Sequence, residues 1–595
     1  MKLISLLAAA ALTCATGIPA GAALAGAVAS LGKLKPGVEA RFSEIRVEGT
    51  DSYVPQGTDP VKGFPPVSYY NPILPGFYPD PSIVRVGADY YLINSSFAFY
   101  PGIPVFHSTD LVRWTQIGNA IDRPGMLDFS GLNTSRGVFA PDISYHDGLF
   151  YIVNTCVDCK GNFVITAKDP KGPWSDPVWL PFGGIDPSIL WDDDGKAYIV
   201  YNDGPQGPPL YDGHRALWLQ EFDPKTLSMV GASQVVVNGG SDIAKKPVWI
   251  EGPHIFKKDG HYYLMAAEGG TEANHSEVIF RSDAVTGPYV PYAGNPILTQ
   301  RDLDKSRPDP VESTGHADLV QAADGQWWAV FLGTRPYAQP QPGQQGPFNT
   351  GRETFLLPFT WTKDAAGKDD WPVIVPQGQA VARDVTVPGM PVQRTNGYRA
   401  HHGYDGGLAW LQIRTPATSF AKRDADEGLI LAAQPEAIGD VASHPAFTGL
   451  RQEQPNTDVN TVVTYRPARD GDRAGIAMVQ SDNFYLFFGR AKRDGQDVLE
   501  VTRRSGAADP RDGVVVARVP APDSDQLYLT AHITGGTATF SYHLPAGIGG
   551  GRVTLLNGGS ETVVADQVDA TNLSTAKAGG FVGAIIGFYA YGQKP

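Results

Sequence analysis

The sequence predicts an all-β protein in which a five-bladed β-propeller is followed by a C-terminal β-sandwich. Three observations support this fold class. Turn-forming residues are abundant, with 68 glycines and 49 prolines in 595 residues, and helical periodicity is weak throughout. One hairpin motif occurs five times in the first part of the chain. The last third instead alternates short polar and apolar runs without that motif, which is typical of a sandwich.

The first residues have the layout of a secretory signal peptide. Lys2 precedes an apolar run, and small residues such as Ala25-Gly-Ala27 then offer a cleavage site. We therefore expect residues 1–27 to be removed, residues 28–67 to form an N-terminal extension, and the mature protein to be periplasmic or extracellular. Cys14 leaves a lipoprotein signal as the weaker alternative. No later apolar run reaches the length of a membrane span.

We predict a propeller for residues 68–376 because the hairpin motif repeats along this segment. Each copy is a turn followed by paired aromatic or β-branched residues, the pattern of a hairpin that enters a buried strand. From Asp89 onward the turn aspartates are 58, 47, 65 and 65 residues apart, which suits four-stranded blades with variable loops. The copies begin at Ala88, Asp147, Asp194, Asp259 and Asp324.

A linker and a second domain follow the propeller. Residues 377–394 are rich in proline and glycine, so we predict a linker there. Residues 395–595 contain short alternating runs such as Thr461-Val-Val-Thr-Tyr, and we predict a β-sandwich. This domain would either bind sugar or cover the propeller.

Cysteine content and charge narrow the class of partner. After loss of the signal peptide only Cys156 and Cys159 remain. In an oxidising compartment the pair is a local disulfide or two free thiols, because no second pair completes a zinc site. The formal net charge is −14 without any basic run, which argues against nucleic acid and anionic membranes. A neutral substrate such as an oligosaccharide fits.

Polar residues stand at the start of the strand that should be innermost in each blade. Because innermost strands surround the axis, Asp80, Asp186, Glu251 and His316 should meet at one mouth of the channel. Three carboxyl groups so placed raise one another's pKa, and such crowding is more often functional than structural. A protonated acid and a second carboxylate are what cleavage of a glycosidic bond requires. Taken singly, Asp80, Asp186 and Glu251 are each better explained by an ordinary turn, so the hypothesis depends on all three falling at equivalent positions of the repeat.

Five motifs along the first part of the chain carry a family resemblance. They are Asn71-Pro-Ile-Leu-Pro-Gly-Phe-Tyr-Pro-Asp-Pro-Ser-Ile, Gly184-Ile-Asp-Pro-Ser, Trp249-Ile-Glu-Gly-Pro-His, Ser313-Thr-Gly-His-Ala and Gly351-Arg-Glu-Thr-Phe. In this order and spacing they resemble glycoside hydrolase family 43, and the resemblance covers about residues 68–376. The later segment is similar to the C-terminal sandwich attached to many β-xylosidases of that family.

The resemblance implies roles for the polar residues. Asp80 would be the general base, Glu251 the general acid, and Asp186 the group that orients Glu251 and raises its pKa. The family inverts, which implies base and acid carboxyls about 6.5 to 9.5 Å apart. Arg352 matches a substrate-contacting arginine, with a structural ion pair as the alternative. His316 matches a histidine that often neighbours a calcium ion or water, with a buried, hydrogen-bonded histidine as the alternative; no cofactor is required.

Aromatic rings are expected to form the sugar platform, because the C–H faces of sugars pack on them. The candidates are Phe99, Tyr100, Phe139 and Trp249, with ordinary blade core as the alternative. Many relatives carry Trp where this chain has Phe139. The long loops 203–213 and 337–349 could wall the channel mouth.

The leading hypothesis is an exo-acting, inverting hydrolase that releases terminal β-D-xylose, α-L-arabinofuranose or both from hemicellulose-derived oligosaccharides. An endo-acting arabinanase would need an open groove instead of a pocket. A non-catalytic, carbohydrate-binding propeller would need the loss of a carboxylate, and all three are present.

Overall fold

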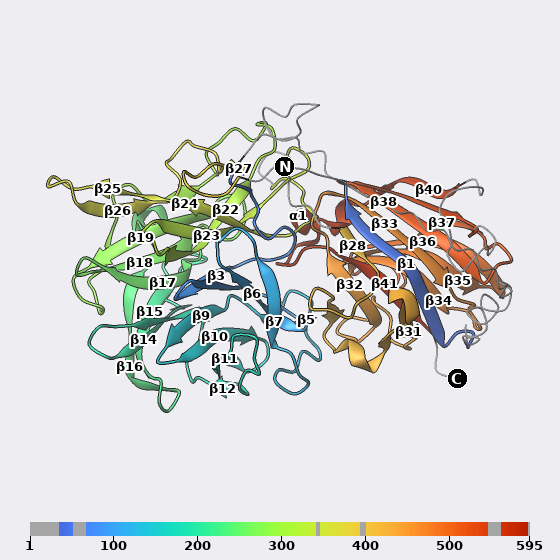
Figure 1. Ribbon diagram of the computed structural model, residues 1–595, viewed down its shortest axis with the longest axis horizontal. Helices are drawn as coiled ribbons and strands as arrows, with labels where there is room; N and C mark the ends of the chain where they lie inside the picture. The colour runs from blue at the N-terminus through green and yellow to red at the C-terminus, as the bar shows by residue number, and fades with distance from the viewer. Residues whose placement is uncertain (1–34, 51–66, 341–344, 393–399, 546–560, 593–595) are drawn as a thin grey trace, which may run out of the picture.

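Nearly all regular structure in the chain is β-strand, arranged as a propeller beside a sandwich (Figure 1). The computed structural model describes residues 35–50, 67–340, 345–392, 400–545 and 561–592, so the predicted signal peptide lies outside the described residues. No helix in this part of the chain is both long and apolar enough to cross a bilayer. The short helices are η1 (Ile243–Lys245), η2 (Ala417–Ser419), η3 (Ala425–Glu427), η4 (Thr571–Leu573) and α1 (Thr575–Ala578).

Five sheets form the blades, which run from blue to yellow-green in Figure 1. The first blade consists of β3 (Ser82–Val86), β4 (Asp89–Ile93), β6 (Gly102–Ser108) and β7 (Thr115–Ile121). The second consists of β8 (Gly137–Val138), β9 (Asp142–His146), β10 (Leu149–Val157), β11 (Gly161–Ala167) and β12 (Val178–Trp179). The third consists of β13 (Ile185–Trp191), β14 (Ala197–Asp203), β15 (Ala216–Asp223) and β16 (Ser228–Asn238). The fourth consists of β17 (Glu251–Lys258), β18 (His261–Glu268), β19 (Ser276–Ser282), β20 (Val290–Pro291) and β21 (Leu298–Thr299), and the fifth of β22 (Glu312–Gln321), β23 (Trp327–Thr334) and β24 (Glu353–Pro358).

The blades form a closed ring around their innermost strands. Strand β3 contacts β9 and β22, β9 contacts β13, β13 contacts β17, and β17 contacts β22. A bridge between Leu74 and Thr354 ties the start of the propeller to its last blade. The five predicted hairpins are confirmed as β3–β4, β9–β10, β13–β14, β17–β18 and β22–β23.

The sandwich consists of two antiparallel sheets, orange to red in Figure 1, packed over one apolar core. One sheet has the order β30–β31–β1–β33–β38–β39–β40, with β28 also paired to β1; the other has the order β32–β41–β34–β35–β36–β37. The bounds in the first are β1 (Glu39–Gly49), β28 (Ala400–His402), β30 (Ala421–Arg423), β31 (Leu429–Ala432), β33 (Asn456–Thr464), β38 (Gln526–Thr534), β39 (Thr537–His543) and β40 (Thr562–Asp569). Those in the second are β32 (Ala446–Arg451), β34 (Arg473–Ser481), β35 (Phe484–Arg493), β36 (Gln496–Ser505), β37 (Val514–Pro520) and β41 (Ile585–Tyr591).

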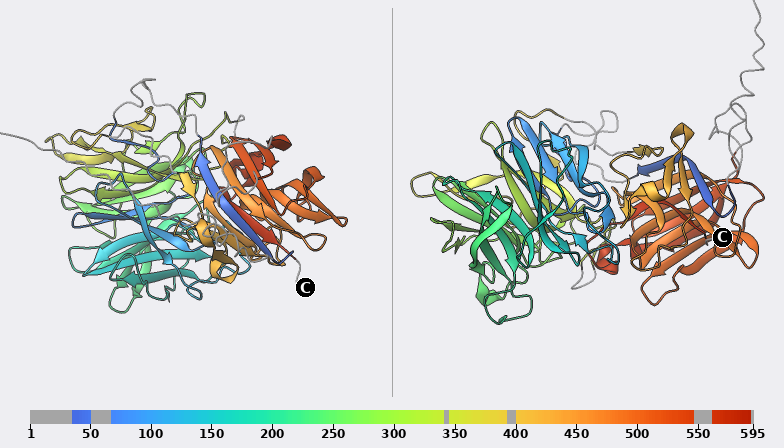
Figure 2. Two further views of the ribbon diagram at one scale, coloured as in Figure 1. Left: turned by 45° about the vertical axis from the view of Figure 1, so that its right-hand side comes forward. Right: turned by 90° about the horizontal axis from the view of Figure 1, so that it is seen from below.

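Strand β1 comes from the segment predicted only as an N-terminal extension, yet it lies inside the sandwich. It is the blue arrow among the orange strands in Figures 1 and 2. Phe42 pairs with Val463 of β33 on one side and with Leu429 of β31 on the other. Its ring lies 4.9 Å from that of Phe588. The propeller is therefore inserted in the sequence between two parts of the sandwich.

Short strands attach the remaining segments. Part of the predicted linker, β27 (Asp384–Val385), pairs with β2 (Tyr69–Tyr70) and packs on the propeller core. Strand β5 (Phe99–Tyr100) of the propeller pairs with β29 (Gln412–Ile413), and so joins the two domains. The hairpin of β25 (Thr360–Lys363) and β26 (Asp369–Val373) follows the last blade.

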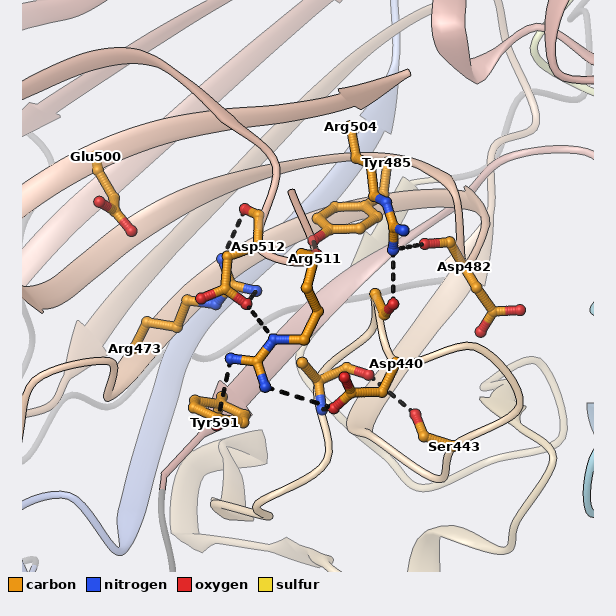
Figure 3. A network of polar contacts seen from close by, with 12 residues as sticks. Asp440, Ser443, Arg473, Asp482, Tyr485, Glu500, Arg504, Arg511, Asp512 and Tyr591 are labelled. Atoms are coloured by element: carbon orange, nitrogen blue, oxygen red, sulfur yellow. Dashed lines mark hydrogen bonds and ion pairs between the residues drawn. The ribbon is translucent and has the colours of Figure 1, made fainter. Parts of the chain in front are cut away.

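Networks of charged residues occur in the sandwich and at the domain interface. Figure 3 shows Arg473, Arg511 and Asp512 in one network: Arg473 Nη2 lies 3.3 Å and Arg511 Nε 3.0 Å from Asp512 Oδ1. At the interface, Arg335 Nε donates to Glu353 at 2.6 Å, and its Nη1 donates to Gln454 of the sandwich at 3.1 Å. The disulfide between Cys156 and Cys159 closes the β10–β11 turn.

Candidate active site

The polar residues at the axis share a local backbone conformation. Asp80, Asp186 and His316 have φ angles of 50°, 54° and 52°, in the left-handed region that side-chain-bearing residues rarely adopt. Strands β13, β17 and β22 have register shifts at this point, and a proline follows each aspartate. A bulge bends its strand and re-aims a side chain. The repeated sequence pattern thus builds a repeated geometry at the channel mouth.

Asp80 is buried among cationic and hydroxyl partners. Its Oδ1 accepts a hydrogen bond from Arg352 Nη1 at 2.8 Å and lies 3.4 Å from Nδ1 of His316. The hydroxyl of Ser95 donates to its Oδ2. Burial alone would raise the pKa of Asp80, but Arg352, His316 and Ser95 together hold it well below its usual range. Asp80 is therefore a carboxylate at neutral pH.

Glu251 and Asp186 interact as a pair in which Asp186 is buried and Glu251 is partly exposed to the pocket. Burial and the negative charge of Asp186 raise the pKa of Glu251 to about 8, against the opposing effect of His316. Burial also raises the pKa of Asp186, to which the amide of Gly252 donates a hydrogen bond. Because the pKa of Glu251 is raised further, Glu251 holds the proton of this pair at neutral pH.

His316 is the cation between these carboxyl groups. Burial lowers the pKa of His316, but Asp80, then Asp186 and Glu251, raise it to about 9. The ring lies against the backbone of Gly252, where an added Cβ would come within 2.4 Å of Nε2. Gly252, with φ of +56°, therefore lets the imidazolium approach the acid carried by the preceding residue.

These groups line a pocket of about 780 Å³ at the channel mouth. The sandwich contributes one wall through Phe581, in the loop between α1 and β41. The Phe581 ring stacks on Phe97 at 5.9 Å and meets Phe139 edge-on at 5.6 Å. Its amide donates to Ser135 Oγ at 3.0 Å, which fixes the loop against the second blade.

The structure divides the four predicted sugar-platform residues into two pairs. Phe139 and Trp249 line the pocket, and Trp249 is 37% exposed. Phe99 and Tyr100 lie outside it in β5, so their prediction as sugar contacts is corrected. The physical reason is their pairing with β29, which buries Phe99 fully in the contact between the two domains.

The two long loops have different roles. Loop 203–213 borders the pocket through Asp203, and the carbonyl of Gly213 accepts a hydrogen bond from the amide of Trp249 at 3.0 Å. In loop 337–349, Tyr337 packs on Gly535 and Gly536 of the sandwich. The described part of this second loop therefore contributes to the domain interface.

Family comparisons agree with this geometry. Residues 69–367 match the model of Glycosyl hydrolases family 43, and residues 404–595 match the Beta xylosidase C-terminal Concanavalin A-like domain. The chain belongs to glycoside hydrolase family 43. It is therefore a glycoside hydrolase, and its fold is the propeller and sandwich of that family.

Characterised relatives align with this family 43 enzyme over most of their length. A xylosidase/arabinosidase from Butyrivibrio fibrisolvens is 35% identical over 87% of this chain and 95% of its own. A non-reducing end α-L-arabinofuranosidase from Bacteroides ovatus is 36% identical over 88% of this chain and 92% of its own. Among solved structures, a family 43, subfamily 12 protein from the capybara gut metagenome is 36% identical, with a TM-score of 0.77 over 94% of this chain and 100% of its own. A xylan β-1,4-xylosidase from Bacillus halodurans is 29% identical, with a TM-score of 0.75 over 88% and 97%.

Some pocket residues of the enzyme were not foreseen from the sequence. Phe97 lies two residues before Phe99, the first residue of the predicted Phe99–Tyr100 pair. Thr271 belongs to no recognisable sequence motif, yet it lines the pocket, and its Oγ1 accepts a hydrogen bond from Arg352 at 3.0 Å. Phe581 follows Gly579-Gly580, which signals a loop but not the surface on which that loop rests. Only the packing of the two domains reveals its place.

Three residues that do not line the pocket form a metal-competent cluster. Asp142, His254 and Asp318 each offer one ligand atom, and these atoms lie within 4.8 Å of one another. Carboxylate and imidazole groups are suitable metal ligands. The cluster offers two carboxylates and one imidazole, whereas calcium takes about six to eight oxygen ligands. These three residues alone therefore do not make up the donor set of the implied calcium ion.

Proposed function

We propose that this hydrolase is exo-acting and inverting, and releases terminal β-D-xylose, α-L-arabinofuranose or both from hemicellulose-derived oligosaccharides. The names of the xylosidase and arabinofuranosidase relatives support this substrate class. The observation that carries the proposal is that Asp80 and Glu251 line one pocket in opposite surroundings. Asp80 is bound to Arg352 and lies beside His316, which lowers its pKa, whereas burial and the carboxylate of Asp186 raise the pKa of Glu251.

The proposed reaction uses the ionised form of Asp80 and the protonated form of Glu251 in one step. Asp80 takes a proton from a water molecule as that water attacks the anomeric carbon. Glu251 gives its proton to the glycosidic oxygen as the bond to the leaving group breaks. Asp186 holds Glu251 protonated, and Arg352 with His316 orients Asp80. Two carboxyl groups supply both proton transfers, so no cofactor is required.

Exo action is supported by the wall that Phe581 adds. A pocket closed on one side by a loop of the second domain accepts a chain end more readily than the middle of a polymer. An endo-acting arabinanase is the alternative. Digestion of long arabinan separates the two, because we expect only free arabinose and no early oligosaccharides.

Replacement of the acid and the base tests the catalytic assignment. We expect Glu251→Gln and Asp80→Asn each to lower kcat roughly 10²–10⁴-fold on natural oligosaccharides. The loss of kcat in Glu251→Gln should be smaller on nitrophenyl glycosides, because their leaving group needs little protonation. In Asp80→Asn the loss of kcat should be the same on nitrophenyl glycosides and on oligosaccharides. Time-resolved NMR of the first product should show the inverted anomer. Unchanged turnover in either variant, or a retained anomer, contradicts the proposal.

We further propose that the enzyme acts outside the cytoplasm. The disulfide at the β10–β11 turn is of the kind that persists in oxidising compartments. Fractionation of the native host, followed by sequencing of the mature N-terminus, should find the enzyme in the periplasm or medium, cleaved near residue 27. A cytoplasmic, uncleaved protein would contradict this.

A further inference from the structure

Three arginines line the pocket, and they differ in what they contact. Arg352 is bound to Asp80, and Arg136 forms a bidentate ion pair with Asp158 at 2.6 and 3.0 Å. Arg215, just before β15, stacks on Trp249 with 4.1 Å between the guanidinium carbon and the ring centroid. Within the described residues, Arg215 has no side-chain hydrogen bond or ion pair. Its five N–H donors are therefore free for a ligand.

The Arg215–Trp249 pair is held in place by the backbone. The Trp249 amide donates to the carbonyl of Gly213, and the Arg215 carbonyl accepts from the amide of Gly239 at 3.0 Å. Trp249 itself has a φ angle of 52°, a conformation that the surrounding structure must impose. The stacked pair is thus a fixed feature of the pocket wall.

The position of this pair identifies the part of the substrate that it meets. Trp249 precedes the general acid Glu251 by two residues, so the two Cα atoms lie within about 7 Å of each other. The general acid protonates the oxygen of the leaving group. Trp249 and Arg215 therefore lie on the leaving-group side of the scissile bond, if the proposed function holds.

The chemistry of the pair favours an acidic sugar. An indole face packs on the C–H face of a sugar ring, and a planar guanidinium matches a carboxylate through two parallel hydrogen bonds. Asp203 and Glu272 also line the pocket. Neither forms an ion pair with Arg215 in the described structure, and Asp203 accepts a hydrogen bond from the amide of Gly204 at 2.7 Å. Among the described residues, the guanidinium of Arg215 therefore has no carboxylate partner within ion-pair distance.

We propose that the enzyme prefers oligosaccharides whose sugar next to the terminal pentose carries a uronic acid, with Arg215 binding its carboxylate. This specificity rests on the proposed function and adds the substrate class on the leaving-group side. Neutral oligosaccharides would still enter the pocket, but without the charge-assisted contact.

The test compares two xylo-oligosaccharides that differ only in a glucuronic acid substituent on the xylose next to the terminal residue. For the wild type we expect the acidic substrate to have the higher kcat/KM, with an advantage that shrinks as salt is added. In Arg215→Met the acidic-to-neutral ratio of kcat/KM should fall tenfold or more, and Arg215→Lys should restore part of it. Arg113 is an exposed arginine of the first blade that does not line the pocket, and Arg113→Met should leave the ratio unchanged.

The outcomes distinguish this inference from the proposed function. Equal losses on both substrates in Arg215→Met would show that Arg215 only supports Trp249, and a wild type without preference for the acidic substrate would also overturn the inference. Calorimetric titration of Glu251→Gln with the two oligosaccharides gives the same comparison without turnover. Failure of the wild type to release pentose from either oligosaccharide or from aryl glycosides would instead overturn the proposed function.

Discussion

At the scale of single residues, partners decide what burial does to a carboxyl group. Asp80 and Glu251 are both enclosed by the protein, and burial alone raises the pKa of each. Arg352 lies against Asp80 and lowers the pKa of Asp80 in spite of its burial. The strongest charge effect on Glu251 comes from the carboxylate of Asp186, which raises the pKa of Glu251 further. Two acids of similar type therefore hold different protonation states in one pocket.

This difference predicts a pH profile. Activity requires Glu251 with its proton, so it is lost as the pH rises through the raised pKa of that residue, while Asp80 stays ionised far into the acid range. Asp186→Asn removes the charge that raises the pKa of Glu251, so the alkaline limb of kcat/KM should move to lower pH by about one to two units. The exposed Asp194→Asn is the control, and its profile should match the wild type. An unmoved alkaline limb in Asp186→Asn would contradict the role given to Asp186.

At the scale of elements, one strand geometry is repeated around the axis. The innermost strands bring Asp186, Glu251 and His316 to one mouth through shifts of register next to these residues. The fold and the convergence of the polar residues could be predicted because a turn recurs in each copy and a proline lies near the polar entry residue in the first four. The placement of Phe99 could not, because pairing with β29 depends on a segment more than 300 residues away that carries no motif.

Two glycines of β17 and its hairpin allow a matched experiment. Gly252 and Gly260 both have positive φ, but a Cβ on Gly252 would clash with His316, whereas one on Gly260 meets open space. Gly260→Ala should cost about 1 kcal/mol of stability from backbone strain alone. Gly252→Ala should cost about 2–4 kcal/mol and lower kcat/KM at least tenfold, because His316 must move. Urea unfolding and steady-state kinetics measure both, and equal behaviour of the two variants would contradict the proposed packing.

At the scale of the whole molecule, the two domains share one site and one network of contacts. Phe581 of the sandwich closes the pocket of the propeller, and Arg335 connects Glu353 with Gln454 across the interface. No motif within either domain predicts such contacts, because they depend on how the domains pack. The sequence therefore predicted two domains but not that the second completes the pocket.

The interface ion pair predicts a loss of stability. Arg335→Met leaves Glu353, which is fully buried, without its cation, and should lower the free energy of unfolding by roughly 3–5 kcal/mol. The exposed pair of Arg113 with Asp110 is the control, since Arg113→Met should cost less than about 1 kcal/mol. Denaturant titration followed by tryptophan fluorescence measures both. A similar small loss in the two variants would show that the interface pair contributes little.

The position of β1 also constrains how the chain is made. This strand leaves the ribosome early, but the hydroxyl of Thr461 that reaches the carbonyl of Ser43 is 418 residues further along the chain. A nascent chain therefore holds an unpaired strand with one apolar face throughout translation of the propeller. Its burial should be among the last events of maturation, and any chaperone that protects the newborn polypeptide has its clearest target in residues 39–49.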